Sequence, residues 1–322
     1  MKELNLITER DIVINTDLDG ILCGIILQNY FSCKIIGFCD SKENIWLKGP
    51  ACVKSLSDLN CQPLTFVDIF ITKEDVVSID QHIVAIDKQH CEEIYSNENK
   101  INPNLNRMRT AQCMRSSCHK DEDFSYFCKY PFGTVHYLIA LAEKGGIQMD
   151  INNNDLNGLF SDLSLFDLIL RADDAAFSTS GKYRDNCLSW WGWLENIGLD
   201  ITKNISSHCT QLQHSKARYV KDKLRNIFQH DLGCKTADGG FSNMLPTNGE
   251  RLNSQMLSYL NIIAEQINME PIAMKLEDSF SLYRGKWLVE YWNNESIKNI
   301  LSNPSLFSYA FINCKQISYT LD

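Results

Sequence analysis

The chain has 322 residues, of which 44% are apolar and 22% are charged, a composition typical of a globular protein and not of a disordered or fibrous one. Its formal net charge of −9 argues against broad, non-specific binding of long nucleic acids. No apolar run approaches the ~20 residues that span a bilayer, and the 13 cysteines occur without a signal peptide. We therefore expect a cytoplasmic location, where thiols stay reduced, and no membrane partner.

The first predicted element is a short buried strand at 12–14, followed by a polar turn and then by an apolar helix that begins with 21–27. Asp17 and Asp19 lie in the turn, and Gly20 lets it be tight. Two carboxylates this close are costly to hold together unless a cation or a proton neutralises them, and oxygen ligands suit a hard divalent metal. The alternative is a polar turn with two solvated aspartates.

Three further strands are predicted, at 33–39, 64–71 and 76–82. Strands that alternate with helices or loops indicate an α/β fold with a mostly parallel sheet flanked by helices. Asp68 and Asp80 fall near the ends of two of these strands. Because the carboxyl ends of parallel strands meet at one edge of the sheet, where ligands bind, we expect Asp19, Asp68 and Asp80 to gather there.

Residues 100–120 contain basic side chains and no acid. Arg107, Arg109 and Arg115 in this stretch belong either to a solvated surface or to a loop that guides an anionic substrate. Thr134 is then predicted to N-cap an apolar helix, and the N-terminus of such a helix is able to hold a phosphate.

A helical apolar pattern over 162–176 ends in Asp173 and Asp174, adjacent acids that oppose the helix dipole and need solvent, Arg171 or a metal beside them. A tryptophan-rich stretch follows, and we place the domain boundary there. The predicted parts are a metal-binding catalytic domain over 1–180, a linker over 181–205 and a smaller mixed α+β C-terminal domain over 206–322.

Within that C-terminal part, helices are predicted at 214–230 and 252–267 and strands at 286–292 and 308–314. Between the two helices, the turn 238–242 contains two adjacent glycines and is able to approach a ligand closely.

Together these pieces resemble the DHH phosphoesterase superfamily, which includes nanoRNA and oligoribonucleotide phosphodiesterases, cyclic dinucleotide phosphodiesterases and family II inorganic pyrophosphatases. The matching motifs span roughly residues 11–177 and occur in the order of the family. They are Asn15-Thr-Asp-Leu-Asp-Gly20, Phe66-Val-Asp-Ile69, the signature Asp80-Gln-His82, and Asp173 or Asp174.

The resemblance implies a site for two metal ions, Mn²⁺ or Mg²⁺, that hydrolyses a phosphodiester bond. By resemblance, Asp17 binds the first ion, Asp19 the second and Asp68 both. The acid that completes the set is Asp173 or Asp174, Asp80 positions or binds, and His82 faces the substrate phosphate. The expected partners are a short oligonucleotide or a small nucleotide, cyclic ones included, and a second copy of the chain in a homodimer.

The chain departs from the family in two places within these motifs. Gln81 stands where the family has a metal-binding histidine, and Val13 where it often has another. An amide oxygen is a weaker ligand than imidazole for manganese. The site therefore binds metal more weakly, prefers magnesium, or has become a nucleotide sensor without hydrolysis. The glycine-glycine-histidine signature of the family's second domain is also missing.

Two rival hypotheses remain. Asp17 to Gly20 also matches the Asp-x-Asp-Gly motif of haloacid-dehalogenase-like phosphatases, in which Asp17 would be the nucleophile and Asp19 an acid/base. The other rival is a zinc site, for which the spacing fits no known signature, so scattered thiols are favoured. Its ligands would be Cys113, Cys118, His119 and Cys128.

Overall fold

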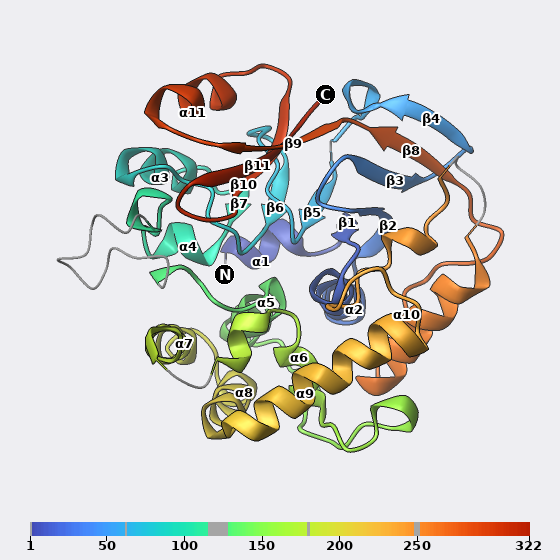
Figure 1. Cartoon of the computed structure of the whole chain (residues 1–322). Coiled ribbons are helices and arrows are strands. Elements are labelled where there is room, and N and C mark those ends of the chain that lie inside the picture. The colour runs from blue at the N-terminus through green and yellow to red at the C-terminus, as the bar shows by residue number, and fades with distance from the viewer. Residues whose placement is uncertain (1, 62, 115–127, 179–180, 248–251) are drawn as a thin grey trace.

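The computed structural model describes residues 2–61, 63–114, 128–178, 181–247 and 252–322 (Figure 1). Within these residues, the strands form two sheets, one of eight strands in the order β4-β8-β3-β2-β1-β5-β6-β7 and one of three in the order β10-β11-β9. Helices flank the large sheet, in which most neighbouring strands run parallel. The predicted α/β fold class is therefore confirmed.

The large sheet combines predicted and unpredicted strands. Its members are β1 (Asp11–Asn15), β2 (Lys34–Cys39), β3 (Asn44–Lys48), β4 (Cys52–Ser55), β5 (Thr65–Val67), β6 (Val77–Ile79), β7 (Lys100–Ile101) and β8 (Phe280–Arg284). The predicted strands correspond to β1, β2, β5 and β6, of which the last two are shorter than expected. β3 runs antiparallel between β2 and β8, so the C-terminal part of the chain returns to the first sheet.

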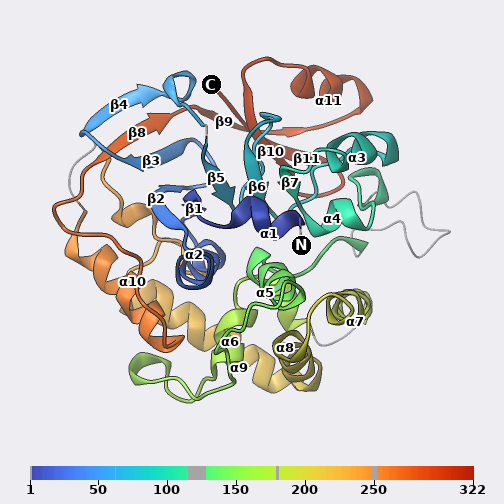
Figure 2. The ribbon, with the colours of Figure 1, turned by 180° about the vertical axis from the view of Figure 1, so that it is seen from behind.

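The helices are α1 (Lys2–Ile7), α2 (Leu18–Phe31), α3 (Lys88–Tyr95), α4 (Pro103–Asn106), α5 (Thr134–Lys144), α6 (Leu165–Leu170), α7 (Gly181–Glu195), α8 (Asp200–Gln211), α9 (His214–Asn226), α10 (Ser254–Gln266) and α11 (Asn294–Leu301). Figures 1 and 2 show α2 and α5 to α10 gathered on one side of the large sheet. Ile12 and Ile14 of β1 belong to the core on that side, and Val13 belongs to a cluster on the opposite face, as alternation along a strand requires. In the described ranges, none of the helices combines the length and the apolar character that a membrane crossing needs.

The predicted linker 181–205 is not what the structure shows, because α7 and α8 occupy most of it. Trp190 is buried, and its ring meets Tyr130 edge-on with 5.1 Å between the centroids. Trp191 lies 4.2 Å from Phe132, measured in the same way. These aromatic side chains share one hydrophobic core with β1 and α2. A solvated linker would expose them, so this stretch packs as part of the core.

The three-stranded antiparallel sheet consists of β9 (Lys286–Tyr291), β10 (Leu306–Phe311) and β11 (Gln316–Leu321). With α11 it packs on the segment around Ile83 and Leu105 in a second hydrophobic cluster. The backbone also joins the two parts, since the Thr72 N–H donates to the Phe307 carbonyl at 2.9 Å. By contrast, α9, α10 and β8 contribute to the main core. The part predicted as a C-terminal domain is thus divided among hydrophobic clusters that it shares with the N-terminal part.

Candidate active site

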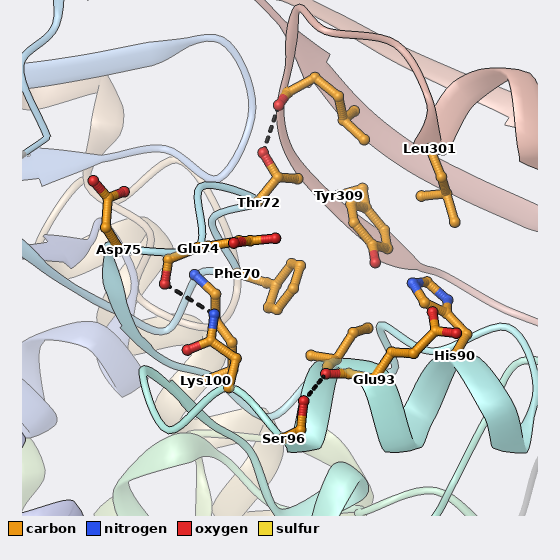
Figure 3. A pocket seen from close by; sticks show the side chains of 13 residues that line it. Phe70, Thr72, Glu74, Asp75, His90, Glu93, Ser96, Lys100, Leu301 and Tyr309 are labelled. Carbon is orange, nitrogen blue, oxygen red and sulfur yellow. Dashed lines mark hydrogen bonds between the residues drawn. The ribbon is translucent and has the colours of Figure 1, made fainter.

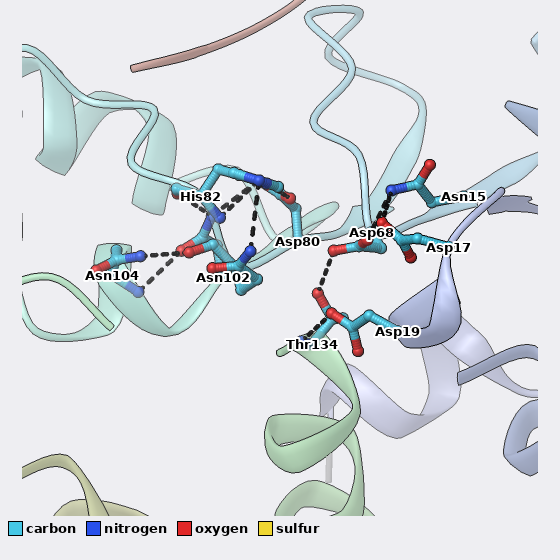
Figure 4. A network of polar contacts seen from close by, with 10 residues as sticks. Asn15, Asp17, Asp19, Asp68, Asp80, His82, Asn102, Asn104 and Thr134 are labelled. Atoms are coloured by element: carbon cyan, nitrogen blue, oxygen red, sulfur yellow. Dashed lines mark hydrogen bonds and ion pairs between the residues drawn. The ribbon is translucent and has the colours of Figure 1, made fainter. Parts of the chain in front are cut away.

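Four neighbouring parallel strands, β1, β5, β6 and β7, end at the same edge of the large sheet, and polar residues follow each of them (Figure 4). These residues are Asn15, Asp17 and Asp19 at β1, Asp68 at β5, Asp80 and His82 at β6, and Asn102 and Asn104 at β7. The structure therefore brings the three strand-end acids together at one edge, as the parallel sheet predicts.

Asn15 holds two of the aspartates in place. Its Nδ2 donates to Asp17 Oδ2 at 2.7 Å and to Asp68 Oδ2 at 2.8 Å. Asp17 is also the N-cap of α2, because its Oδ1 accepts the Gly20 N–H at 2.9 Å. Asn15 was not among the predicted site residues, although it lies at the end of β1, where the strand-end rule points.

Asp19 faces the N-terminus of α5. The N–H groups of Thr134 and Val135 donate to its carboxylate at 2.6 and 2.9 Å, and the Thr134 hydroxyl donates to Asp68 Oδ1 at 2.8 Å. The N-cap of α5 is Gly133, so the predicted capping role of Thr134 is wrong. A phosphate at this helix terminus would compete with the Asp19 carboxylate, which already occupies it.

Asp68 ends β5 in the left-handed region, with a φ of 62°. A non-glycine residue there costs about 1–2 kcal/mol. Its N–H still donates to the Ile79 carbonyl at 2.7 Å, so the turn stays attached to β6. Strain of this kind often marks functional sites, and here the turn directs the carboxylate to Asn15 and Thr134.

Asp80 orients His82. The Asp80 carboxylate is buried and lies 2.7 Å from Nδ1 of His82, whose side chain is 40% exposed. Asn102 Nδ2 donates to the His82 carbonyl at 2.8 Å and to Asp80 Oδ2 at 3.3 Å. Burial lowers the pKa of His82, but the Asp80 carboxylate, its hydrogen bond and the charge of Asp68 outweigh this and raise that pKa to about 9. His82 is therefore positively charged at neutral pH.

Gln81 lies between these two residues in the sequence. Together with His82 it lines a cavity that adjoins the acids. Its main-chain carbonyl accepts Asn104 Nδ2 at 2.6 Å. Its side-chain Nε2 lies 3.4 Å from Nε2 of His82. Gln81 is thus next to the acids and in contact with the imidazole.

Negative charge accumulates at this edge. Burial and then the neighbouring Asp17 raise the pKa of Asp19 to about 7. Burial and the charge of Asp19 raise the pKa of Asp68 well above its usual range, and loss of hydration followed by Asp68 does the same for Asp17. In the described part of the chain, no lysine or arginine forms an ion pair with any of these three carboxylates.

The donor set fits a divalent cation. Ligand atoms of Asp68, Asp80 and His82 all lie within 4.8 Å of one another, and this is the one group of its kind among the described residues. The carboxylate oxygens of Asp68 and Asp80 suit Mg²⁺ or Mn²⁺, and the His82 imidazole would join them as a ligand only after losing its proton. Asp17 and Asp19 are not part of this group. Asn15 hydrogen-bonds both Asp17 and Asp68, and Thr134 hydrogen-bonds both Asp19 and Asp68, so the two acids are adjacent to it.

The structure separates Asp174 from the other acids. Its carboxylate pairs with Arg171 at 2.6 Å and with Lys221 of α9 at 2.8 Å, and its side chain is 53% exposed. This pairing explains how adjacent acids are tolerated at the end of α6. Asp173 is half-buried and lies close enough to Tyr130, a neighbour of Asp19, to contribute to the raised pKa of that phenol. Of the two, Asp173 is the nearer to the cluster.

Arg107 and Arg109, two of the arginines predicted to bind substrate, do not line the cavity next to the acids. The Arg107 guanidinium lies over the Trp190 ring, 4.3 Å from its centroid, and donates to Ser189 of α7 at 3.4 Å. Arg107 and Arg109 are both half-buried, and neither lines the cavity beside the acids. Arg115 lies outside the described residues.

A cavity of about 320 Å³ opens between the acid edge and the three-stranded sheet. Asp68, His82 and Lys129 line one side, and Ser308, Thr320 and their neighbours on β10 and β11 line the other. Lys129 supplies the positive charge that was expected from the arginines. It was not predicted from the sequence, because no local pattern distinguishes it from other lysines.

The glycine turn 238–242 also reaches the site, as its composition indicates. The Leu18 N–H donates to the Asp238 carbonyl at 3.1 Å, and the Phe241 N–H donates to the Thr16 carbonyl at 2.8 Å. The Asp238 charge contributes to the raised pKa of Asp17. A further acid from the C-terminal half therefore lies near the cluster.

A second cavity, of about 680 Å³, lies next to α3 and shares Phe70 and Tyr309 with the first (Figure 3). Lys100 reaches it from β7, and burial lowers the pKa of that lysine to about 8. Its ammonium donates to the carbonyls of Ile71, Lys73 and Val76 at 2.6–2.8 Å. All three of its donors are thus used to hold the turn after β5, which indicates a structural role.

The zinc hypothesis gains no geometric support. Cys113 is buried and its Sγ lies 3.1 Å from the Thr110 hydroxyl. Cys118 and His119 lie outside the described residues.

Comparisons of this chain with family models, with curated proteins and with solved structures return no match. What the site does has to be inferred from its own residues.

Proposed function

We propose that this chain is a metal-dependent phosphodiesterase, DHH-like, that hydrolyses short oligonucleotides or small nucleotides. The observation that carries the proposal is the convergence of Asp68, Asp80 and His82, next to Asp17 and Asp19, at the carboxyl ends of parallel strands. Within the residues that the structure describes, Asp17, Asp19 and Asp68 form no ion pair with a lysine or arginine, so a cation would neutralise them. The adjoining cavity has room for a phosphate and its substituents.

In this proposal Asp17, Asp19, Asp68 and Asp80 hold two Mn²⁺ or Mg²⁺ ions. When bound, the ions would activate a water and neutralise charge on the phosphate. Asn15 and Thr134 keep the Asp68 carboxylate oriented. His82, positively charged and held by Asp80, donates to a phosphate oxygen, and Lys129 adds positive charge on the same wall of the cavity.

The proposal is tested with a substrate panel of bis-p-nitrophenyl phosphate, linear dinucleotides, cyclic dinucleotides and pyrophosphate, each with Mn²⁺, Mg²⁺ or EDTA. We expect Asp68→Ala to lower turnover at least about 100-fold and to abolish metal binding, because Asp68 is central among the acids. It shares Asn15 with Asp17 and Thr134 with Asp19, and its carboxylate lies within 4.8 Å of ligand atoms of Asp80. Glu92→Ala, which removes an exposed acid on α3, is the matched control. Circular dichroism checks that both variants fold. Wild-type turnover in Asp68→Ala would refute the proposal.

A second candidate is a nucleotide sensor without hydrolysis, favoured by Gln81 in place of an imidazole ligand. In that case no member of the panel is hydrolysed with any metal, while calorimetry still detects nucleotide binding. Metal-dependent turnover by the wild type would exclude the sensor.

A further inference from the structure

One face of β9 carries two exposed aromatic rings, Trp287 and Tyr291, with Val289 between them. Among the described strands, β9 pairs with β11 alone, so it forms an edge of the three-stranded sheet. Trp287, Val289 and Tyr291 are 37%, 39% and 74% exposed, and their spacing places them on one face. We call these three side chains the platform. Exposed aromatic side chains grouped in this way usually mark a binding surface.

The platform continues the wall of the cavity beside the acids. In the register of the sheet, Trp287 lies opposite Thr320 and Val289 lies opposite Ser318. Residues opposite each other share a face of the sheet, and Thr320 and Ser318 line the cavity together with Asp68 and His82. A molecule held at the acids and extending along this face would therefore reach the aromatic rings.

The side chains along this face change in character with distance from the acids. Beside the cavity they are small and polar, Ser308, Ser318 and Thr320, which leaves room for a phosphate and a sugar. At the edge they are aromatic, and the Lys42 ammonium lies 5.0 Å from the centroid of the Trp287 ring, where it would attract a phosphate. Trp287 and Tyr291 are four residues apart, about 13 Å along a strand, so each ring is able to take its own base.

We propose that the platform stacks the bases of a short single-stranded oligonucleotide whose scissile phosphate lies at the acid edge. The proposal rests on the proposed function for the position of the phosphate, and it narrows the substrate to an oligonucleotide of more than one base. A polar chain fits the polar wall and the nearby lysines Lys42 and Lys129 better than an apolar protein surface does.

The test is the affinity of the full chain for a fluorescein-labelled pentamer of deoxyadenylate, measured by anisotropy with Ca²⁺ present and with the probe shown to be intact afterwards. We expect Trp287→Ala and Tyr291→Ala each to weaken binding about tenfold, the usual effect of losing one base–aromatic stack. Trp287→Phe keeps an aromatic face and should retain most of the affinity. Tyr95→Ala, which removes an exposed ring on α3, should change nothing.

Equal affinity in all four variants would overturn the platform, whether or not the wild type hydrolyses the substrate panel. The platform is also overturned if Trp287→Ala converts a dimer into a monomer on size-exclusion chromatography without changing the affinity for the probe. In that case this face of β9 joins two copies of the chain. If the wild type hydrolyses nothing but the platform variants lose affinity, the platform stands and the phosphodiesterase proposal fails.

Discussion

At the scale of single residues, neutral donors organise the acid edge. Asn15 and Thr134 hydrogen-bond the Asp68 carboxylate from two sides, and neither carries a charge. Such bonds fix the direction of a carboxylate but leave its charge in place, so the raised pKa values of Asp19 and Asp68 persist. The arrangement is suited to receive a cation and costs stability without one.

Gly133 makes the close approach of Asp19 to α5 possible. A methyl group at this position would lie 2.8 Å from Cγ of Asp19 and 2.7 Å from the Ala172 side chain. We expect Gly133→Ala to displace the carboxylate and to lower turnover of bis-p-nitrophenyl phosphate at least about tenfold, as small misplacements in catalytic sites do.

Gly192→Ala in α7 is the control, because an added methyl group meets nothing within 4 Å there. Turnover at the wild-type level in Gly133→Ala, with an intact fold, would show that the position of Asp19 does not matter for the reaction.

At the scale of elements, α5 connects the acid edge to the helical layer. The N–H groups at its N-terminus donate to the carboxylate of Asp19 from α2. Its last turn contains Glu143, which is buried. The Glu143 carboxylate accepts the N–H groups of Leu199, Ile201 and Thr202 at 2.7–2.9 Å and the Thr202 hydroxyl at 2.6 Å. An acid at the end of one helix, where the dipole disfavours it, is thus stabilised by the N-terminus of α8.

Glu143→Ala is expected to lower the free energy of unfolding by about 3 kcal/mol, because several buried donors lose a charged acceptor at once. Glu143→Gln keeps one acceptor oxygen and should lose less. Urea denaturation followed by circular dichroism measures both. A loss below about 1 kcal/mol for Glu143→Ala would mean that water replaces the carboxylate at the start of α8.

At the scale of the whole molecule, the cavity lies between the carboxyl ends of the parallel strands and the three-stranded sheet. Most of the buried apolar residues that line it belong to the hydrophobic cluster of the three-stranded sheet, and Ile69 belongs to the cluster that contains Val13. The acids come from the parallel strands and Ser308 and Thr320 from the three-stranded sheet, so the cavity exists only in the folded chain. An ion that binds to the acids beside the cavity binds only the folded chain, so ion binding stabilises the entire fold.

This coupling predicts a pH-dependent effect of metal on the melting temperature. The pKa of Asp19 rises from 3.8 to about 7 on folding, so the metal-free protein loses stability as pH rises from about 4 to above 7. At pH values below about 7, where the Asp19 carboxylate takes up its proton, protons compete with metal for the carboxylates. We expect Mn²⁺ to raise the melting temperature by at least about 3 °C at pH 8 and by less at pH 5.

Differential scanning fluorimetry of the wild type and Asp68→Ala, with Mn²⁺ or EDTA, measures this effect. Asp68→Ala should show no increase with Mn²⁺ at either pH. An equal increase in both proteins would place the ion elsewhere on the molecule.

Local pattern was enough to predict the strand ends that carry the acids. Apolar runs followed by Asp17, Asp68 and Asp80 predict parallel strands with acids at one edge, because strand periodicity and the polarity change after it are properties of neighbouring residues. Most of the parallel strands of the large sheet, and the acids at their ends, could therefore be predicted from the sequence. Asn15, although it was not chosen, lies in the same predicted turn.

Contacts between distant segments decided the rest. Arg107 lies on Trp190, and Asp174 is paired with Lys221 of α9, although both were expected at the site. Likewise Lys129, from the segment before α5, lines the cavity together with residues of β10 and β11. Trp287 shares a face with Thr320 because β9 and β11 pair. The partner of a long charged or aromatic side chain depends on which surfaces the fold brings next to it, and composition and spacing along the chain do not contain that information.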